Sequence, residues 1–142
     1  MLKKSIHRDL KPENIVIKST DNDKLNFNVK LTDFGLSTFR TSIRTHSLTG
    51  TRKYYTPEID TFNYNNKCDF WSLGVILYEL YTNKYIFDSE NNRQKGIKKT
   101  DNKLINKLIK VNIEERIKWE EYFNDDFFKI NKTKMKINKQ FK

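Results

Sequence analysis

The chain has 142 residues, 36% of them apolar, and a net charge of +10, a size and content that suit one domain with its own core. Its single cysteine excludes an internal disulfide, and the sequence has neither a secretory leader pattern nor the roughly 20 consecutive apolar residues of a membrane-spanning helix. We therefore expect an intracellular protein, cytoplasmic or nuclear, that does not enter a membrane.

The positive charge alone does not indicate a nucleic-acid-binding protein. Lysine dominates the basic residues, and arginine, which reads base edges better, occurs only 6 times. A solvated lysine-rich surface is the usual meaning of such a composition. Positive charge is locally dense only in residues 129–142, with Lys129, Lys132, Lys134, Lys136, Lys139 and Lys142. We expect this segment to be a flexible basic tail.

The first elements predicted in chain order are two strands. Residues 15–17 are a β-branched run, residues 19–23 supply turn formers, and in residues 27–31 apolar and polar side chains alternate. This order predicts a β-hairpin with a longish connection. Residues 36–56 have no sustained apolar period and are crowded with serine and threonine, so we expect a long loop of the kind that is usually functional or disordered.

Helices are predicted in the second half of the chain. Residues 69–81 are apolar on nearly every face, which is typical of a helix buried on all sides. Residues 83–101 are polar and predict loop with at most a fragmentary helix, whereas residues 104–109 have an amphipathic helical period and residues 118–123 predict a third helix. The expected fold is mainly α with a small β-hairpin, one domain over residues 1–128 followed by the tail at 129–142.

Three oxygen-bearing side chains are placed so that the hairpin can bring them together. Asp9 and Asn14 are five residues apart before its first strand, and Asp33-Phe34-Gly35 follows its second. Phosphoryl transfer needs a carboxylate that accepts the proton of the attacking hydroxyl, and oxygen ligands for the magnesium ions on the phosphates. Each motif alone is common, but their order and connection together are specific.

With these motifs the chain resembles the serine/threonine protein kinases, and in particular the C-terminal lobe of their catalytic domain. The residues that carry the resemblance are the loop His7-Arg8-Asp9-Leu10-Lys11-Pro12-Glu13-Asn14, the metal motif Asp33-Phe34-Gly35, the pair Gly50-Thr51, the triplet Thr56-Pro57-Glu58 with threonine in place of the usual alanine, the run Asp69-Phe70-Trp71-Ser72-Leu73-Gly74, and Arg116. The likeness covers residues 1 to about 128. The stretches 30–37 and 66–69 further resemble the calcium/calmodulin-dependent group.

The resemblance implies roles at the matching positions, with ATP and Mg²⁺ as cofactors and a protein as substrate. Asp9 would orient the substrate hydroxyl and accept its proton, Asn14 and Asp33 would hold magnesium, and Lys11 would contact the transferring phosphate. The residues implied to bind the cofactor are Lys11, Asn14, Asp33 and Val16. Thr51 would bridge Asp9 and Lys11, and Glu13 would attract a basic residue of the substrate.

Other matching positions are implied to be structural. His7 would pack on Phe34, Asp69 would accept backbone N–H groups of the catalytic loop, and Glu58 and Arg116 would form a buried ion pair. Arg8 would receive the phosphate of a modified loop residue. Ser47 is the expected regulatory phosphosite, with Thr45 and Thr49 as rivals.

The glycine-rich loop and strand lysine by which kinases hold ATP from above have no counterpart in these 142 residues, so we expect an absent N-terminal lobe. Two functions therefore compete: a truncated serine/threonine kinase, whose isolated chain would have negligible activity, and an inactive interaction module that binds a kinase, an N-terminal-lobe partner or a substrate. A nucleic-acid binder acting through the basic tail is a weaker, unlikely alternative.

Overall fold

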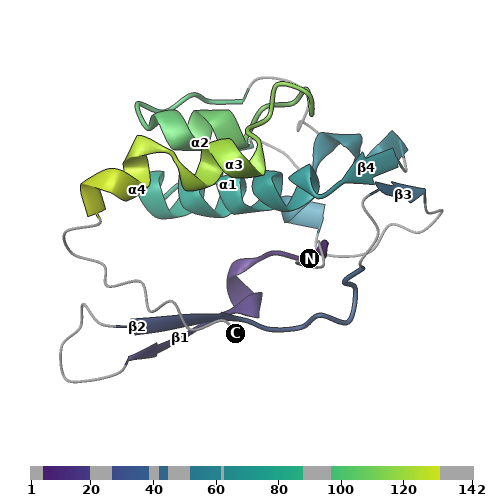
Figure 1. The fold of residues 1–142 in the computed structure, drawn as a ribbon, viewed down its shortest axis with the longest axis horizontal. Coiled ribbons are helices and arrows are strands. Elements are labelled where there is room, and N and C mark those ends of the chain that lie inside the picture. Colours follow the sequence, from purple (N-terminus) through teal and green to yellow (C-terminus); the bar gives the residue numbers. More distant parts are fainter. Residues whose placement is uncertain are drawn as a thin grey trace.

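The computed structural model describes residues 5–19, 27–38, 42–44, 52–61, 63–87 and 97–131. Its centre is helix α1 (Lys67–Thr82), which has α2 (Lys103–Leu108) and α3 (Trp119–Phe123) on one side and a β-hairpin on the other (Figure 1). The N-terminal segment runs between α1 and the hairpin. A further short helix, α4 (Asp126–Asn131), follows α3.

The predicted hairpin is confirmed. Strand β1 (Ile15–Ser19) pairs antiparallel with β2 (Phe27–Leu31), and the register places Ile15 opposite Leu31 at the open end. A 3₁₀ turn, η1 (Pro12–Asn14), leads directly into β1. Proline at its first position suits such a turn, because a proline nitrogen has no hydrogen to leave unpaired. Residues 5–14 are thereby joined to the end of the hairpin where the two strands meet the rest of the fold.

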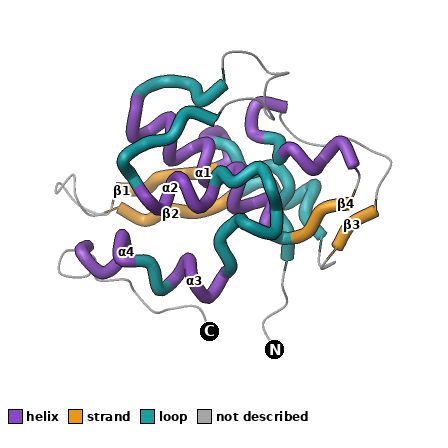
Figure 2. The backbone as a smooth tube through the Cα atoms, turned by 90° about the horizontal axis from the view of Figure 1, so that it is seen from above, coloured by secondary structure: helices purple, strands orange, loops and turns teal. Residues whose placement is uncertain are grey.

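The predicted loop at residues 36–56 is wrong in part, because it contains regular elements. Strand β3 (Ser42–Arg44) pairs antiparallel with β4 (Asn63–Asn65), and the 3₁₀ turns η2 (Arg52–Tyr54) and η3 (Pro57–Thr61) lie between them in sequence. These strands lie at the end of the molecule away from α4 (Figure 2). Three-residue strands are too short for a local pattern, and their partner comes about twenty residues later, so periodicity does not reveal them.

Helix α1 confirms the strongest helical prediction, and its buried side supplies much of the core. Trp71 and Val75 are fully buried, Ile76 is nearly so, and the helix ends at Asn83 in the left-handed conformation that often closes a helix. The prediction that this helix is buried on all sides is wrong, however, because Leu80 and Tyr81 are 77% and 53% exposed. The described part of the chain leaves the last turn of α1 uncovered on that face.

The C-terminal helices pack through aromatic side chains. The ring centroid of Phe70 in α1 lies 4.2 Å from that of Trp119 and 5.1 Å from that of Tyr122. Tyr122 in turn packs against Phe128 of α4. Helices α2 and α3 lie where the sequence predicts them. Helix α4 is missed, and it extends to Asn131, past the predicted start of the tail at Lys129; residues 132–142 lie outside the described residues.

Gly74 lies at a close approach of α1 to the C-terminal end of α2. A Cβ atom there would lie 2.7 Å from Cγ2 of Ile109 and 2.8 Å from Cβ of Leu108. Helix α2 is itself fixed at its start, where the Asn102 side chain accepts hydrogen bonds from the backbone N–H of Leu104 and Ile105. The two helices therefore cannot separate without disturbing a fully buried contact.

We expect Gly74→Ala to destabilise the protein by about 1–3 kcal/mol, since the overpacking at Leu108 and Ile109 outweighs the roughly 0.5–1 kcal/mol by which alanine favours a helix. Urea unfolding would measure this. Lys103→Ala, at an exposed position of α2, is the control and should change the free energy of unfolding by less than about 0.5 kcal/mol. A Gly74→Ala protein more stable than the parent would contradict the close contact.

Candidate active site

The loop from His7 to Asn14 is tied to helix α1 by one buried carboxylate. Asp69 accepts hydrogen bonds from the backbone N–H of His7 at 2.8 Å and of Arg8 at 3.0 Å. Burial raises the pKa of Asp69, although these two hydrogen bonds favour its charged form. Arg8 has a φ of 73°, a conformation uncommon outside glycine. The contact predicted for Asp69 is thus present, and it stabilises an unusual backbone turn immediately before Asp9.

Asp9 is the buried centre of this loop. Its Oδ2 lies 2.9 Å from Nζ of Lys11 and accepts a hydrogen bond of 3.2 Å from Nδ2 of Asn14, which also donates to the Asp9 carbonyl oxygen at 2.9 Å. The Asp9 side chain is 6% exposed and the Lys11 side chain 21%. The hydrogen bond to Asp9 raises the pKa of Lys11, so the lysine stays protonated. The structure therefore brings together the three residues predicted to carry the chemistry.

Thr32 connects this loop to the segment of Asp33. The Thr32 N–H donates to the carbonyl oxygen of Asn14 at 2.9 Å, and its hydroxyl reaches the same oxygen at 3.3 Å. Nε2 of His7 lies 3.0 Å from the Thr32 carbonyl oxygen. Sequence reasoning missed Thr32, because a threonine at the end of a strand has no distinguishing pattern. Its hydrogen bonds place Asn14 and Asp33 at the same end of the hairpin.

Asp33 is exposed and has an unusual backbone conformation. Its φ is 57°, its side chain is exposed, and its Oδ1 accepts a hydrogen bond from the Gly35 N–H at 3.3 Å. Positive φ is tolerated best by asparagine and aspartate among residues with a side chain, and such backbone strain clusters at functional sites. Phe34 packs on His7 with ring centroids 4.8 Å apart, as predicted. This contact connects the metal motif to the catalytic loop a second time.

The donor set fits magnesium. Asn14 uses its amide nitrogen on Asp9, which leaves the amide oxygen for a cation, and Asp33 offers a carboxylate. Within the described ranges there is no cluster of three or more His, Cys, Asp or Glu side chains that could hold a metal ion. Mg²⁺ does not need one, because it is commonly bound by one or two protein oxygens together with water and substrate phosphates. Asn14 and Asp33 are therefore the residues that would hold it.

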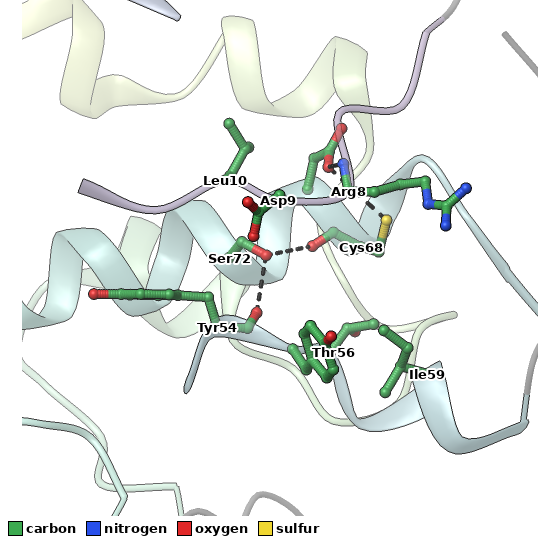
Figure 3. Close-up of a pocket in the computed structure, with 10 residues that line it drawn as sticks. Arg8, Asp9, Leu10, Tyr54, Thr56, Ile59, Cys68 and Ser72 are labelled. Carbon is green, nitrogen blue, oxygen red and sulfur yellow. Dashed lines mark hydrogen bonds between the residues drawn. The ribbon is translucent and has the colours of Figure 1, made fainter. Parts of the chain in front are cut away.

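A cavity of about 20 Å³ lies beneath Asp9 (Figure 3). Asp9 and Leu10 meet Tyr54 and Ser72 there, and the Ser72 hydroxyl donates to the Tyr54 carbonyl oxygen at 2.9 Å. A space of this size holds about one water molecule and no substrate. The cavity shows instead that η2, which carries Tyr54, lies close to the catalytic loop and is hydrogen-bonded to α1. Ser72 was missed as a contributor because a single hydroxyl within an apolar helix resembles a spacer.

Arg116 joins the segment after η2 to the late part of the chain. Its guanidinium donates to both carboxylate oxygens of Glu58 at 2.6 and 2.8 Å, and also to the Thr56 hydroxyl and the carbonyl oxygens of Lys67 and Lys110. The Arg116 side chain is fully buried and that of Glu58 is 11% exposed. The predicted ion pair is present. Planar, bidentate geometry makes it one of the strong pairs.

Four predicted residues cannot be placed. Thr45, Ser47, Thr49 and Thr51 lie outside the described residues, so the phosphosites and the bridge from Thr51 to Asp9 and Lys11 stay predictions. The remaining predicted positions, Glu13 and Val16, are both exposed, Val16 at 47%. Val16 lies on β1 opposite Lys30, and it is available to a ligand above the hairpin.

A buried aspartate that contacts a lysine and an asparagine, with a second aspartate on the segment that Thr32 joins to the same loop, is an arrangement compatible with phosphoryl transfer. Comparison with known proteins agrees, because the model of the protein kinase domain matches residues 2–140. The chain belongs to the protein kinase domain family.

The curated relatives are serine/threonine kinases. Serine/threonine-protein kinase 33 of Mus musculus is 40% identical over 104 residues, which are 66% of this chain and 21% of the relative. Serine/threonine-protein kinase atg1 of Dictyostelium discoideum is 31% identical over 144 residues, 91% of this chain and 21% of the relative. The chain thus spans about a fifth of the length of the curated relatives it matches. Likeness to kinase 33 is consistent with the calcium/calmodulin-dependent group, which remains a prediction.

Among the described residues, no helix combines the length and the apolar character needed to cross a membrane.

Proposed function

We propose that the chain is the C-terminal-lobe part of a serine/threonine protein kinase that transfers the γ-phosphoryl group of ATP to a hydroxyl of a protein substrate. The observation that supports this most directly is the state of Asp9, whose buried carboxylate is held between Lys11 and Asn14. A carboxylate fixed in this way can accept a proton in a defined direction. An intracellular location, cytoplasmic or nuclear, is part of the same proposal.

The roles of the residues follow from their contacts. Asp9 accepts the proton of the substrate hydroxyl as that oxygen attacks the phosphorus. Lys11 pairs with Asp9 and is 21% exposed, so its ammonium can turn toward the transferring phosphate while Asn14 still donates to Asp9. Asn14 and Asp33 supply oxygens to Mg²⁺, and the ion, when bound, neutralises phosphate charge. Val16 offers an apolar surface to the adenine.

The alternative is an interaction module that transfers nothing. It draws support from one observation, an open groove lined mainly by apolar side chains where α1, α2 and α4 meet. Leu80 and Tyr81 are the exposed residues of α1 on that groove. Apolar surface of this kind often marks a site of association. The intact set of Asp9, Lys11, Asn14 and Asp33 favours the kinase, because an inactive module needs none of them.

The two functions differ in what the chain does once the other half of a kinase cleft is supplied. Residues 1–142 alone should give negligible transfer from radiolabelled ATP to a mixture of protein substrates, because half a cleft neither encloses the nucleotide nor clamps its phosphates. The same residues fused behind a glycine-rich-loop lobe from a serine/threonine kinase should transfer phosphate to serine and threonine. A folded but inactive fusion would support the interaction module, and robust transfer by residues 1–142 alone would refute the need for a second lobe.

A further inference from the structure

The backbone of η2 is held by side-chain hydroxyls from outside the turn. The hydrogen bond within η2 uses the carbonyl oxygen of its first residue, and so short a turn leaves its later carbonyl oxygens to other donors. The Tyr85 hydroxyl donates to the Lys53 carbonyl oxygen at 2.9 Å. The Ser72 hydroxyl donates to the Tyr54 carbonyl oxygen, also at 2.9 Å. The turn is therefore bonded at two points, to α1 and to the segment that follows α1.

Ser72 directs its hydroxyl away from its own helix. A serine inside a helix commonly donates to the carbonyl oxygen four residues earlier. That oxygen, of Cys68, lies 3.3 Å from the Ser72 hydroxyl, whereas the Tyr54 carbonyl oxygen is closer at 2.9 Å (Figure 3). A hydroxyl has one proton to donate, and the shorter contact is the stronger bond. Ser72 therefore joins α1 to η2, and an alanine in its place would leave the Tyr54 carbonyl oxygen without this donor.

Tyr85 is positioned through its ring. The ring meets that of Phe87 edge-on with centroids 5.6 Å apart, and the Lys53 ammonium lies 4.7 Å from its centroid. Both contacts are made by the ring, and the bond to η2 is made by the hydroxyl. Tyr85→Phe would therefore keep the ring contacts and remove the bond to the turn.

The position of η2 bears on the catalytic loop through Tyr54. This residue is 5% exposed and belongs to a buried core cluster on which Leu10, directly after Asp9, packs. Tyr54, Ser72, Leu10 and Asp9 also line the small cavity beneath Asp9. A displacement of η2 would enlarge this cavity and loosen the packing next to Asp9. In an active site a misplacement of about 1 Å can reduce the rate by about 10².

We propose that Ser72 and Tyr85 are positioning residues: their hydroxyls hold η2 in place, and η2 in turn supports the loop that carries Asp9. Neither hydroxyl acts on the substrate, because each bonds to a backbone oxygen of the turn. The expected effect on transfer rests on the proposed function, whereas the hold on η2 does not depend on it.

Hydrogen exchange of the full chain, resolved to single amides, tests the hold on η2. The Tyr55 N–H, which bonds to η2 at 3.2 Å, is the reporter, and the Ile59 N–H, which bonds within η3 at 3.1 Å, is the internal reference. Ser72→Ala and Tyr85→Phe should each accelerate exchange at Tyr55 by about 5- to 20-fold, because a partly buried carbonyl oxygen loses its donor. Exchange at Ile59 should change by less than about twofold.

Tyr81→Phe is the matched control. It removes the exposed Tyr81 hydroxyl of α1, which donates to Asp101 at 2.9 Å, and it should leave the Tyr55 and Ile59 amides unchanged. If Ser72→Ala fails to fold, Tyr85→Phe decides the question. Unchanged exchange at Tyr55 would overturn the inference. Equal acceleration at both amides would also overturn it, because it would show a general loss of stability.

Kinetics distinguish positioning from a purely structural role. In the fusion that supplies the upper lobe, Tyr85→Phe should lower kcat about three- to tenfold and leave KM for ATP unchanged, because the disturbance reaches the loop around Asp9 and not the proposed magnesium ligands. Accelerated exchange at Tyr55 with an unchanged kcat would refute the positioning role. An inactive parent fusion would count against the proposed function itself, and the exchange result would still decide whether the two hydroxyls hold η2.

Discussion

Asp9→Asn should lower the rate of phosphoryl transfer by about 10³-fold in a fusion that supplies the upper lobe, within the range of 10²–10⁴ that general-base catalysis contributes. Asparagine has the volume of aspartate and can still accept a hydrogen bond from Lys11 or Asn14 through its one oxygen. It cannot take a proton from the substrate hydroxyl. The effect should fall on kcat, with little change in KM for ATP, since Asp9 holds neither the nucleotide nor the metal in the proposed mechanism.

Steady-state kinetics on purified fusion proteins would measure this effect. Glu115→Gln is the matched control, because Glu115 is an exposed carboxylate, 61% accessible, in a 3.9 Å surface pair with Lys110. Its kinetics should equal those of the parent. An Asp9→Asn protein that keeps more than a tenth of the parent rate would show that the proton goes elsewhere.

The largest expected effect on stability comes from Arg116. Arg116→Leu should lower the free energy of unfolding by about 3–5 kcal/mol, since it leaves the buried Glu58 carboxylate without its partner. The Thr56 hydroxyl and the carbonyl oxygens of Lys67 and Lys110 lose a donor at the same time. The free energy of unfolding of Arg116→Lys should lie between those of the parent and Arg116→Leu, because lysine keeps the charge but cannot make the planar, bidentate contact.

Urea unfolding, with the midpoint and the slope analysed separately, would measure the loss. Glu58→Leu combined with Arg116→Leu should be less destabilised than the sum of the single changes, because neither charge is then buried alone. Lys110→Ala, in the exposed pair with Glu115, should cost no more than about 1 kcal/mol. Additive effects of the two leucine substitutions would mean that Glu58 and Arg116 stabilise the fold independently.

Any loss of activity in an Arg116 variant has to be read with this result in mind. Among the described contacts Arg116 has none with Asp9 or Asp33, yet it fixes the segment from Thr56 to Glu58, which follows η2 and the hydrogen bond from Ser72 of α1 to Tyr54. A variant that unfolds would lose transfer and binding together. Asp9→Asn should lose transfer alone.

The sequence predicts those parts of the structure whose information is local or belongs to a recognisable motif. Helix α1 and the hairpin follow from apolar periods, and the motif resemblance anticipates contacts across long separations, such as Asp69 with His7 and Arg8, or Arg116 with Glu58. These contacts join residues some sixty positions apart, so no period or propensity could reveal them. These long-range contacts were predicted from the family resemblance, which periodicity and propensity could not replace.

The features that the sequence does not predict are contacts between distant residues that belong to no recognisable motif. Strands β3 and β4 have three residues each, and each is a strand because it pairs with the other. The Lys53–Glu79 pair joins the turn η2 to the C-terminal end of α1, and nothing in the spacing of the two residues marks them as partners. Exposure of Leu80 and Tyr81 was missed for a related reason, because an apolar side chain on a helix does not reveal whether another segment covers it.

The hairpin also has a consequence for how this region can vary. Its strands are in register from Ile15 and Leu31 onward, and the Thr32 N–H donates to the Asn14 carbonyl oxygen at the open end, so the separation of Asn14 and Asp33 is fixed there. Ser19 and Phe27 pair at the opposite end of the two strands. Insertions or deletions between these two residues should therefore leave the two proposed magnesium ligands where they are, which makes this connection a tolerant site for evolutionary change or for an inserted tag.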